Sequence, residues 1–187
     1  MGMAYRAATQ DDIAAVLALH FKNQVDSMAE EDKQDGFITT AFTQQQMQAL
    51  IRDENGLFVA ELDDEIVAYA MAASWQFWSQ WPMFAYMVDD LHTVEYQGIQ
   101  LSVENSYQYG PVCVDKRVRG SGVFEGVFQF ALEQMAKRYA VLVTFINKIN
   151  ARSYAAHTQK VGLDVVKKFE YNGNNYYELA CLTSAKE

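Results

Sequence analysis

The residues with the clearest chemical meaning form a glycine-rich turn in the second half of the chain. Arg117, Gly120 and Gly122 give the pattern R-x-x-G-x-G, with an apolar run over residues 109–114 before it and an apolar helical pattern over residues 123–135 after it. The first turn of a helix has N–H groups without intrahelical partners and carries the positive end of the helix dipole. Glycines let a phosphate approach the backbone closely. The turn is therefore predicted to bind a phosphorylated ligand.

The spacing of the glycines separates several kinds of phosphate site. A P-loop requires G-x-x-x-x-G-K-[ST], and no lysine follows the glycines in this way. A dinucleotide fingerprint requires G-x-G-x-x-G, whereas Gly120, Gly122 and Gly126 are spaced one residue too widely. The segment 141–146 also lacks the carboxylate that would bind a ribose. This weakens the nucleotide interpretation without removing it, and a glycine turn without a ligand is a further alternative.

The elements that must position this turn are strands and helices in a mixed order. Thr43 with Gln46 is spaced as a helix N-terminal cap, and Asn172-Gly173 is typical of a β-hairpin turn. The expected order is β-α-α-β-β-insert-β-α-β-α-β-β, which favours a mixed α/β architecture. Strands are expected over residues 5–8, 57–62, 66–73, 107–114, 141–146, 163–169 and 176–182, and a strand or an extended arm over residues 99–103. Later helices are expected over residues 82–91, 123–138 and 150–161.

Composition and charge limit the function classes that the chain can serve. The 187 residues carry a formal net charge of −9, which argues against nucleic-acid binding and would tolerate a cationic substrate. No apolar run approaches the ~20 residues that cross a bilayer, and the N-terminus lacks a signal-peptide core, so we expect a cytoplasmic protein without a membrane partner. Cys113 and Cys181 lie in apolar runs and lack metal-ligand spacing, which predicts reduced thiols and no metal site.

From the glycine turn onward, the sequence resembles the GNAT superfamily of N-acetyltransferases. Arg117 to Gly122 matches the family motif [QR]-x-x-G-x-[GA] without a gap, and Asn150 begins a segment that ends at Gly162-Leu163, like the second family motif. The resemblance implies an α/β, GNAT-like (acyl-CoA N-acyltransferase) fold. Its sheet would be mixed and mostly antiparallel, with a splayed central strand and flanking helices. It also implies a single domain over residues 1–187, with acetyl-CoA as cosubstrate and no metal.

The same resemblance implies where acetyl-CoA would bind. In the family, the backbone of the splayed strand bonds to the pantetheine arm, and Gly110-Pro111 would suit a bulge there. The pyrophosphate rests on the glycine turn, and an asparagine at the start of the later helix bonds to pantetheine. The cofactor-binding residues implied are Val112, Cys113, Val114, Arg117, Val118, Arg119, Gly120, Ser121, Gly122, Val123, Asn150 and Ser153. Solvated arginines and a helix-capping Asn150 are the alternatives.

The reaction implied is direct attack of an amine on the thioester in a ternary complex. Many family members protonate the departing thiolate with a tyrosine seven residues after the asparagine, where this chain has His157, and the asparagine-to-glycine spacing is one residue longer than usual. His157 could donate if protonated, and Tyr154 lies on the same helix; packing is the alternative for both. Glu104 is a candidate general base or a solvated turn carboxylate, and a base acting through water is equally open.

Aromatic residues concentrate between the expected third and fourth strands, where residues 75–86 include all three tryptophans. In the family this side borders the acceptor site, so the segment could form an amine pocket; core packing or a homodimer interface is the alternative. The sequence predicts an N-acetyltransferase acting on a small-molecule or peptide amine. The alternative is a non-catalytic acyl-CoA-binding or interaction module with the same fold. The acceptor itself cannot be read from the sequence.

Overall fold

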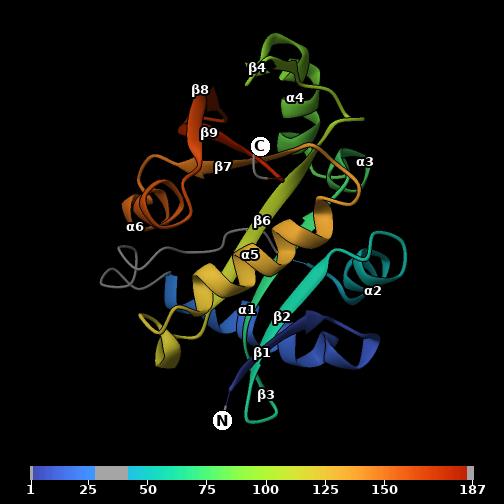
Figure 1. The fold of residues 1–187 in the computed structure, drawn as a ribbon, viewed down its shortest axis with the longest axis vertical. Helices are drawn as coiled ribbons and strands as arrows, with labels where there is room; N and C mark the ends of the chain where they lie inside the picture. The colour runs from blue at the N-terminus through green and yellow to red at the C-terminus, as the bar shows by residue number, and fades with distance from the viewer. Residues whose placement is uncertain (1, 28–41, 185–187) are drawn as a thin grey trace. The chain divides into compact units, whose positions relative to one another are not determined.

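The structure, a computed structural model, describes residues 2–27 and 42–184 (Figure 1). Two compact units divide the chain, and strand β6 (Ser106–Val114) and helix α5 (Val123–Met135) contribute residues to both. Unit 1 comprises Met1–Ala72 and Gly110–Ala131, and unit 2 comprises Ala73–Tyr109 and Leu132–Glu187.

Unit 1 is built on a strand meander. Strands β1 (Met3–Ala7), β2 (Leu57–Leu62) and β3 (Glu65–Ala73) lie side by side in Figure 1 and pair antiparallel in that order. Strand β3 is also the hydrogen-bonded neighbour of β6. The strands predicted over residues 57–62 and 66–73 are therefore confirmed, and they form an antiparallel hairpin. Two helices complete the described part of the unit before β2, namely α1 (Ile13–Ser27) and α2 (Gln44–Arg52).

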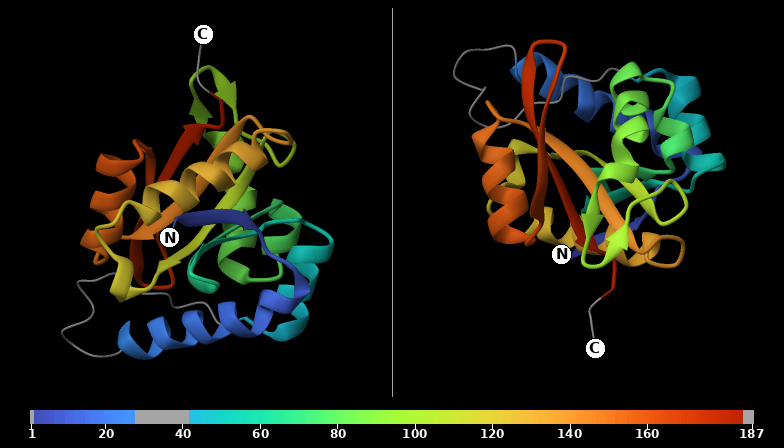
Figure 2. Two further views of the ribbon diagram at one scale, coloured as in Figure 1. Left: turned by 60° about the horizontal axis from the view of Figure 1, so that its bottom comes forward. Right: turned by 90° about the horizontal axis from the view of Figure 1, so that it is seen from above.

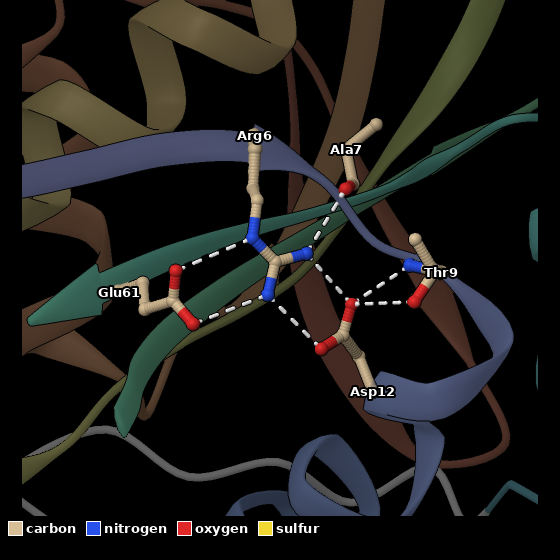
Figure 3. Close-up of polar contacts among 5 residues, drawn as sticks. All are labelled: Arg6, Ala7, Thr9, Asp12 and Glu61. Carbon is tan, nitrogen blue, oxygen red and sulfur yellow. Dashed lines mark hydrogen bonds and ion pairs between the residues drawn. The ribbon is translucent and has the colours of Figure 1, made fainter. Parts of the chain in front are cut away.

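An arginine network joins the first strand of unit 1 to its neighbours (Figure 3). Arg6 on β1 donates from Nη1 to Asp12 at 2.7 Å and from Nη2 to Glu61 on β2 at 3.3 Å. Asp12 ends the short 3₁₀ turn η1 (Gln10–Asp12) and also accepts from the Thr9 backbone N–H at 2.7 Å. The hydrogen bond from Arg6 lowers the pKa of Asp12. One guanidinium thus holds the chain where β1 ends and helix α1 begins.

The core of unit 1 forms where apolar helix faces meet buried strands. Val16 on α1 and both Met47 and Leu50 on α2 are fully buried. The start of α2 is set by its predicted cap, because Thr43 Oγ1 accepts from the Gln46 N–H and the Gln46 side chain accepts from the Thr43 N–H. Strand β3 is buried along seven successive residues, as expected for a strand covered on both faces.

Unit 2 contains the other half of the sheet, in the order β6-β7-β9-β8. Strand β7 pairs in parallel with β6, while β9 pairs antiparallel with both β7 and β8. The elements of this unit, in addition to the first part of β6, are α3 (Trp75–Trp78), α4 (Pro82–Asp90), η3 (Leu91–Thr93), β4 (Glu95–Tyr96), β5 (Ile99–Gln100), β7 (Val141–Asn147), α6 (Ala151–Ala155), η5 (Ala156–Lys160), β8 (Asp164–Tyr171) and β9 (Asn174–Leu182).

Helices cover both faces of the unit 2 strands. Helix α6 and helix α4 lie on opposite sides of β7 and β9 in the right-hand view of Figure 2. On one side, the ring of His157 packs on the ring of Tyr109, with their centroids 5.5 Å apart; His157 lies in the turn that continues α6. On the other side, the ring of Phe84 on α4 packs on that of Phe145, also with centroids 5.5 Å apart. Across the described ranges, no helix is long and apolar enough to cross a membrane.

The ladder between β6 and β7 is short. It joins Ser106–Gln108 to Val141–Val143, although β6 continues to Val114 and β7 to Asn147. The next carbonyl, that of Tyr109, accepts instead from two side chains, Thr144 Oγ1 and Gln108 Nε2, each at 2.7 Å. The sheet is thus mostly antiparallel, and its parallel ladder ends early, as expected for a splayed central strand.

Two expectations about elements need correction. The strand expected over residues 99–103 is shorter, because Ile99–Gln100 pairs only with the two residues of β4. The helix expected over residues 150–161 changes character midway, since α6 gives way at residue 156 to a π turn over Ala156–Lys160. A π turn accommodates one extra residue in a helix, which accounts for the longer asparagine-to-glycine spacing.

Candidate functional site

The glycine turn lies in unit 1 and has the backbone that its sequence predicts. Gly120 and Gly122 have φ values of +82° and +89°, which favour glycine. A Cβ atom at either position would meet no atom within 4 Å among the described residues. Glycine is therefore required by backbone conformation and not by crowding. The space above both residues is open to a ligand.

Helix α5 begins immediately after this turn. Its first hydrogen bond runs from Gly126 N to Gly122 O at 3.0 Å, so the N–H groups of residues 123–125 have no partner within the helix. These donors and the helix dipole favour an anion at the turn without a metal ion. The arrangement fits a pyrophosphate group.

Arg117 is directed toward carboxylates of unit 1. Its Nη2 lies 2.8 Å from both Asp115 Oδ2 and Glu65 Oε2, and its backbone N–H donates to Asp115 at 3.0 Å. Asp115 is buried, and the hydrogen bond from the guanidinium lowers its pKa to about 2. These contacts shape the 3₁₀ turn η4 (Lys116–Val118) that leads from β6 into the glycines. A contact of Arg117 with a phosphate stays a prediction.

The rest of the turn continues this local bonding. The half-buried Arg119 donates from Nε to the carbonyl of Val114, the last residue of β6, at 3.4 Å. Ser121 bonds back to the Val118 carbonyl through both its N–H and its hydroxyl group. The segment is thus a structured turn in which Gly120 and Gly122 supply the special backbone angles.

Strand β6 enters the turn with alternating exposure. Val112 and Val114 are half-buried, whereas Cys113 is buried. Burial raises the pKa of the Cys113 thiol to about 12, although Arg119 opposes the shift. A thiol in this state is a poor nucleophile, because the thiolate is the reactive form.

Asn150 lies in unit 2 and caps helix α6. Its Oδ1 accepts from the Ser153 N–H at 3.2 Å, and its carbonyl accepts from the Tyr154 N–H at 3.1 Å. The capping role considered from the sequence is therefore present. It uses only the side-chain oxygen, so the amide N–H groups of Asn150 are left as donors.

His157 is buried between its own helix and strand β6. Its Nδ1 lies 2.9 Å from the Ser153 carbonyl oxygen, and its Nε2 lies 3.2 Å from the Tyr109 hydroxyl. A carbonyl oxygen can only accept, so Nδ1 carries the proton and Nε2 accepts from Tyr109. Burial lowers the pKa of His157 to about 4. The protonated form that a general acid needs is therefore disfavoured at neutral pH.

Tyr154 offers a different environment on the same helix. It is half-buried, and its ring lies 4.5 Å from that of Tyr177. Its hydroxyl forms no hydrogen bond within the described segments. Of the two candidate acids in unit 2, Tyr154 is the one whose proton is not already donated to a neighbour.

Glu104 lies outside the helices and strands of unit 2. It is exposed, in the turn five positions before Tyr109 that leads into β6. The exposure of Glu104 fits the alternative of a solvated turn carboxylate. The role of Glu104 as a general base stays a prediction.

The aromatic segment of unit 2 is largely core. Trp75 and Trp78 are fully buried, and their indole N–H groups donate to Ser106 Oγ at 3.0 Å and to the Gln108 carbonyl at 3.1 Å. Tyr86 is 41% exposed. The tryptophans therefore fix α3 against β6, which is the packing alternative weighed from the sequence.

Sequence reasoning missed two polar residues of unit 2. Gln108 and Glu178 are 1% and 3% exposed and lie in the strands β6 and β9. For Glu178, a signal was present, because it is the one charged residue in the otherwise apolar and aromatic run over residues 176–182. A carboxylate in a buried strand is unusual and points to a specific role.

Solved structures share this fold. An N-acetyltransferase from Staphylococcus aureus Mu50 is 19% identical, with a TM-score of 0.64 over 98% of this chain and 100% of the other. A ribosomal-protein-alanine N-acetyltransferase from Brucella melitensis is 18% identical, with a TM-score of 0.62 over 96% and 99%. The structure of yncA from Salmonella typhimurium with its cofactor acetyl-CoA is 15% identical, with a TM-score of 0.66 over 100% and 96%. These similarities define the fold as that of the GNAT class.

The sequence itself matches the family model described as the acetyltransferase (GNAT) family over residues 21–163. The chain therefore belongs to the GNAT acetyltransferase family, whose fold supports acyl transfer. None of the curated protein sequences matches it.

Proposed function

We propose that this chain is an N-acetyltransferase that transfers the acetyl group of acetyl-CoA directly to a primary amine. The observation that carries the proposal is the glycine turn, in which two residues with positive φ lead directly into the first turn of α5. Acetyl-CoA supplies the activated acetyl group as a thioester. The structure solved with acetyl-CoA, that of yncA, is similar to this chain over its full length, which supports the choice of donor.

The residues of unit 1 hold the donor in this proposal. Backbone N–H groups at Gly120, Gly122 and Val123 bind the pyrophosphate, aided by the dipole of α5. Backbone groups of Val112 and Val114 bind the pantetheine arm. Arg117 keeps the turn in shape through Asp115.

The residues of unit 2 manage protons and orientation in this proposal. Asn150 caps α6 and offers its amide N–H groups to the donor's amide. Tyr154 supplies the proton that the departing thiolate needs, since its hydroxyl forms no hydrogen bond among the residues that the structure describes. His157 acts as a neutral positioning residue that accepts from the Tyr109 hydroxyl. The buried Cys113 thiol takes no part, so no acyl-enzyme forms.

One observation favours a second candidate function. The position at which many family members have a catalytic tyrosine holds a buried, neutral His157. A non-catalytic acyl-CoA-binding module would also tolerate this residue. Release of free thiol from acetyl-CoA in the presence of a panel of amines distinguishes the two functions, because a module binds acetyl-CoA without releasing thiol.

A pair of glycine variants tests the donor site. Gly120 and Gly173 both have φ of +82°, and both would direct a Cβ into open space, but Gly173 lies in the β8–β9 hairpin turn. Each Gly→Ala change should destabilise the protein by about 1–2 kcal/mol through backbone strain. Only Gly120→Ala should weaken acetyl-CoA binding, by at least about tenfold, because its methyl group occupies the phosphate position. Equal acetyl-CoA dissociation constants for the two variants, measured by calorimetry, would remove the turn as the donor site.

A further inference from the structure

One face of the sheet in unit 2 gathers polar residues beneath α4. Gln108 pairs with Val143, and Phe145 pairs with Glu178. Paired residues share a face of a sheet, as do residues two apart on a strand. Gln108, Phe145 and Glu178 therefore point to the same side. This is the side of α4, because Phe84 packs on Phe145 (Figure 2).

Two oxygen atoms on this face accept no hydrogen bond. Gln108 Oε1 and Glu178 Oε2 are the buried side-chain polar atoms that lack a partner in the part of the chain that the structure describes. The orientation of Gln108 is set by its neighbour, because its nitrogen must face the Tyr109 carbonyl, which can only accept. Buried acceptors without donors are costly and rare in native proteins. Both atoms can accept a hydrogen bond from a ligand.

The charges near Glu178 favour a cationic donor. Lys167 on β8 pairs with Glu178 across the strands, but its ammonium group bonds to Asp90 of α4 and to Thr93. Its ion pair is with Asp90, and it acts on Glu178 as a nearby charge. Burial raises the pKa of Glu178 to about 7, with Lys167 opposing and Asp90 adding to the shift. A second cation would restore the balance when Glu178 is ionised.

The remaining neighbours are aromatic. Phe145, beside Glu178, has its ring 5.5 Å from Phe84 and 5.6 Å from Tyr176. Phe84 in turn contacts Trp78 at 5.0 Å. Such a surface favours an apolar group and attracts a cation to the ring faces. A ligand that satisfies all of these groups combines an ammonium ion with an apolar body.

We propose that this face binds the acceptor, a protonated primary amine with an aromatic substituent, through Glu178 Oε2 and Gln108 Oε1. That the bound amine is the acceptor rests on the proposed acetyltransferase function. It makes Glu178 and Gln108 specificity-determining residues of unit 2.

Titrations of three probes test this site. 2-Phenylethylamine, its neutral analogue 2-phenylethanol and n-butylamine are each titrated calorimetrically into the protein saturated with coenzyme A. The wild type should bind 2-phenylethylamine at least about tenfold more tightly than either of the others. Glu178→Gln should remove that preference by weakening 2-phenylethylamine about tenfold. The control Glu170→Gln, an exposed carboxylate on the neighbouring strand β8, should not change it.

The outcomes separate this site from the proposed function. Equal binding of 2-phenylethylamine by Glu178→Gln and the wild type, or no amine binding by the wild type, overturns the site. Binding that depends on Glu178 without acetyl transfer supports the site and contradicts the transferase. Transfer to 2-phenylethylamine with the same KM in Glu178→Gln supports the transferase and overturns the site. Gln108→Glu, which keeps an acceptor oxygen at this position, should retain the preference for the amine over the alcohol.

Discussion

The proton on His157 is held at Nδ1 by the Ser153 carbonyl, and this one hydrogen bond decides what the side chain can do. Its other nitrogen is left as an acceptor for the Tyr109 hydroxyl. With a pKa lowered to about 4 by burial, the ring cannot deliver a proton at neutral pH. In the proposed mechanism the acid role therefore belongs to Tyr154 on α6, whose hydroxyl forms no hydrogen bond within residues 2–27 and 42–184.

Removing the Tyr154 hydroxyl tests this assignment. Tyr154→Phe should lower kcat about 100-fold, the lower end of what general acid catalysis contributes, with little change in the KM for acetyl-CoA. Tyr177→Phe is the matched control, because it removes a hydroxyl from the ring that stacks on Tyr154. Initial rates of thiol release measure both variants. A Tyr154→Phe enzyme with the kcat of the wild type would contradict the role.

Single residues differ in how well the sequence predicts them. The capping role of Asn150 was predictable, because capping depends on local backbone geometry. The neutral, buried state of His157 was not predictable, because it depends on contact with Tyr109, which is 48 positions away in the sequence. Glu178 likewise acquires its environment from Lys167 and Asp90 on other elements.

At the level of elements, the packing of β1 against α5 in unit 1 depends on one glycine. Gly126 is the third glycine that the sequence offered to a dinucleotide fingerprint. A Cβ there would lie 2.0 Å from the Tyr5 hydroxyl oxygen and 2.2 Å from the ring carbon that carries it. The residue is therefore small because a strand side chain crosses the helix at this point, which gives it a packing role.

A double-mutant cycle tests this packing. Gly126→Ala should lower the free energy of unfolding by about 1–3 kcal/mol in the wild type through overpacking. In a Tyr5→Ala background the same change should raise it by up to about 1 kcal/mol, because alanine is the better helix former. Urea unfolding of the four proteins measures the cycle. The same cost in both backgrounds would show that Tyr5 is not the cause.

Elements with local signals were predicted well. The Thr43 cap and the hairpin turn at Asn172-Gly173, with φ values of +52° and +82° at its two residues, form as expected. The strand expected to reach residue 103 did not, because a strand extends only as far as its partner, and β4 has two residues. The π turn after α6 was visible only as an unexplained extra residue in a spacing.

At the scale of the molecule, two buried groups should give opposite pH dependences of stability. The pKa of His157 falls from 6.5 to about 4, so the unfolded chain binds that proton more tightly and stability decreases as the pH falls through this range. The pKa of Glu178 rises from 4.5 to about 7, so the folded chain binds that proton more tightly and stability decreases as the pH rises through that range. Each effect amounts to roughly 3 kcal/mol over its full range.

Between pH 5 and 6 the two slopes, each about 1 kcal/mol per pH unit, should nearly cancel in the wild type. Glu178→Gln removes one of them. Its free energy of unfolding should therefore rise by about 1 kcal/mol from pH 5 to pH 6, owing to His157 alone. Urea unfolding at the two pH values checks this, with Glu170→Gln expected to follow the wild type. Equal pH slopes for Glu178→Gln and the wild type would show that Glu178 is not buried with a raised pKa.

The GNAT fold was predictable from one motif and the order of elements, because both reflect local sequence patterns. The division into two compact units was not predictable, because it depends on contacts between residues that are distant in the sequence, such as those that pair β6 with β7. The expectation of a single domain over residues 1–187 stays a prediction.

The chain has two cysteines, and each unit contains one of them, Cys113 in unit 1 and Cys181 in unit 2. Both thiols are free, and burial raises the pKa of each to about 12. Cys113 is buried, so a thiol reagent can react rapidly with it only after the surrounding structure opens, whereas Cys181 is half-buried. The rate at which a Cys181→Ser variant is labelled therefore reports the opening of unit 1 around strand β6. Thiol labelling of Cys113 can thus measure the local stability of unit 1.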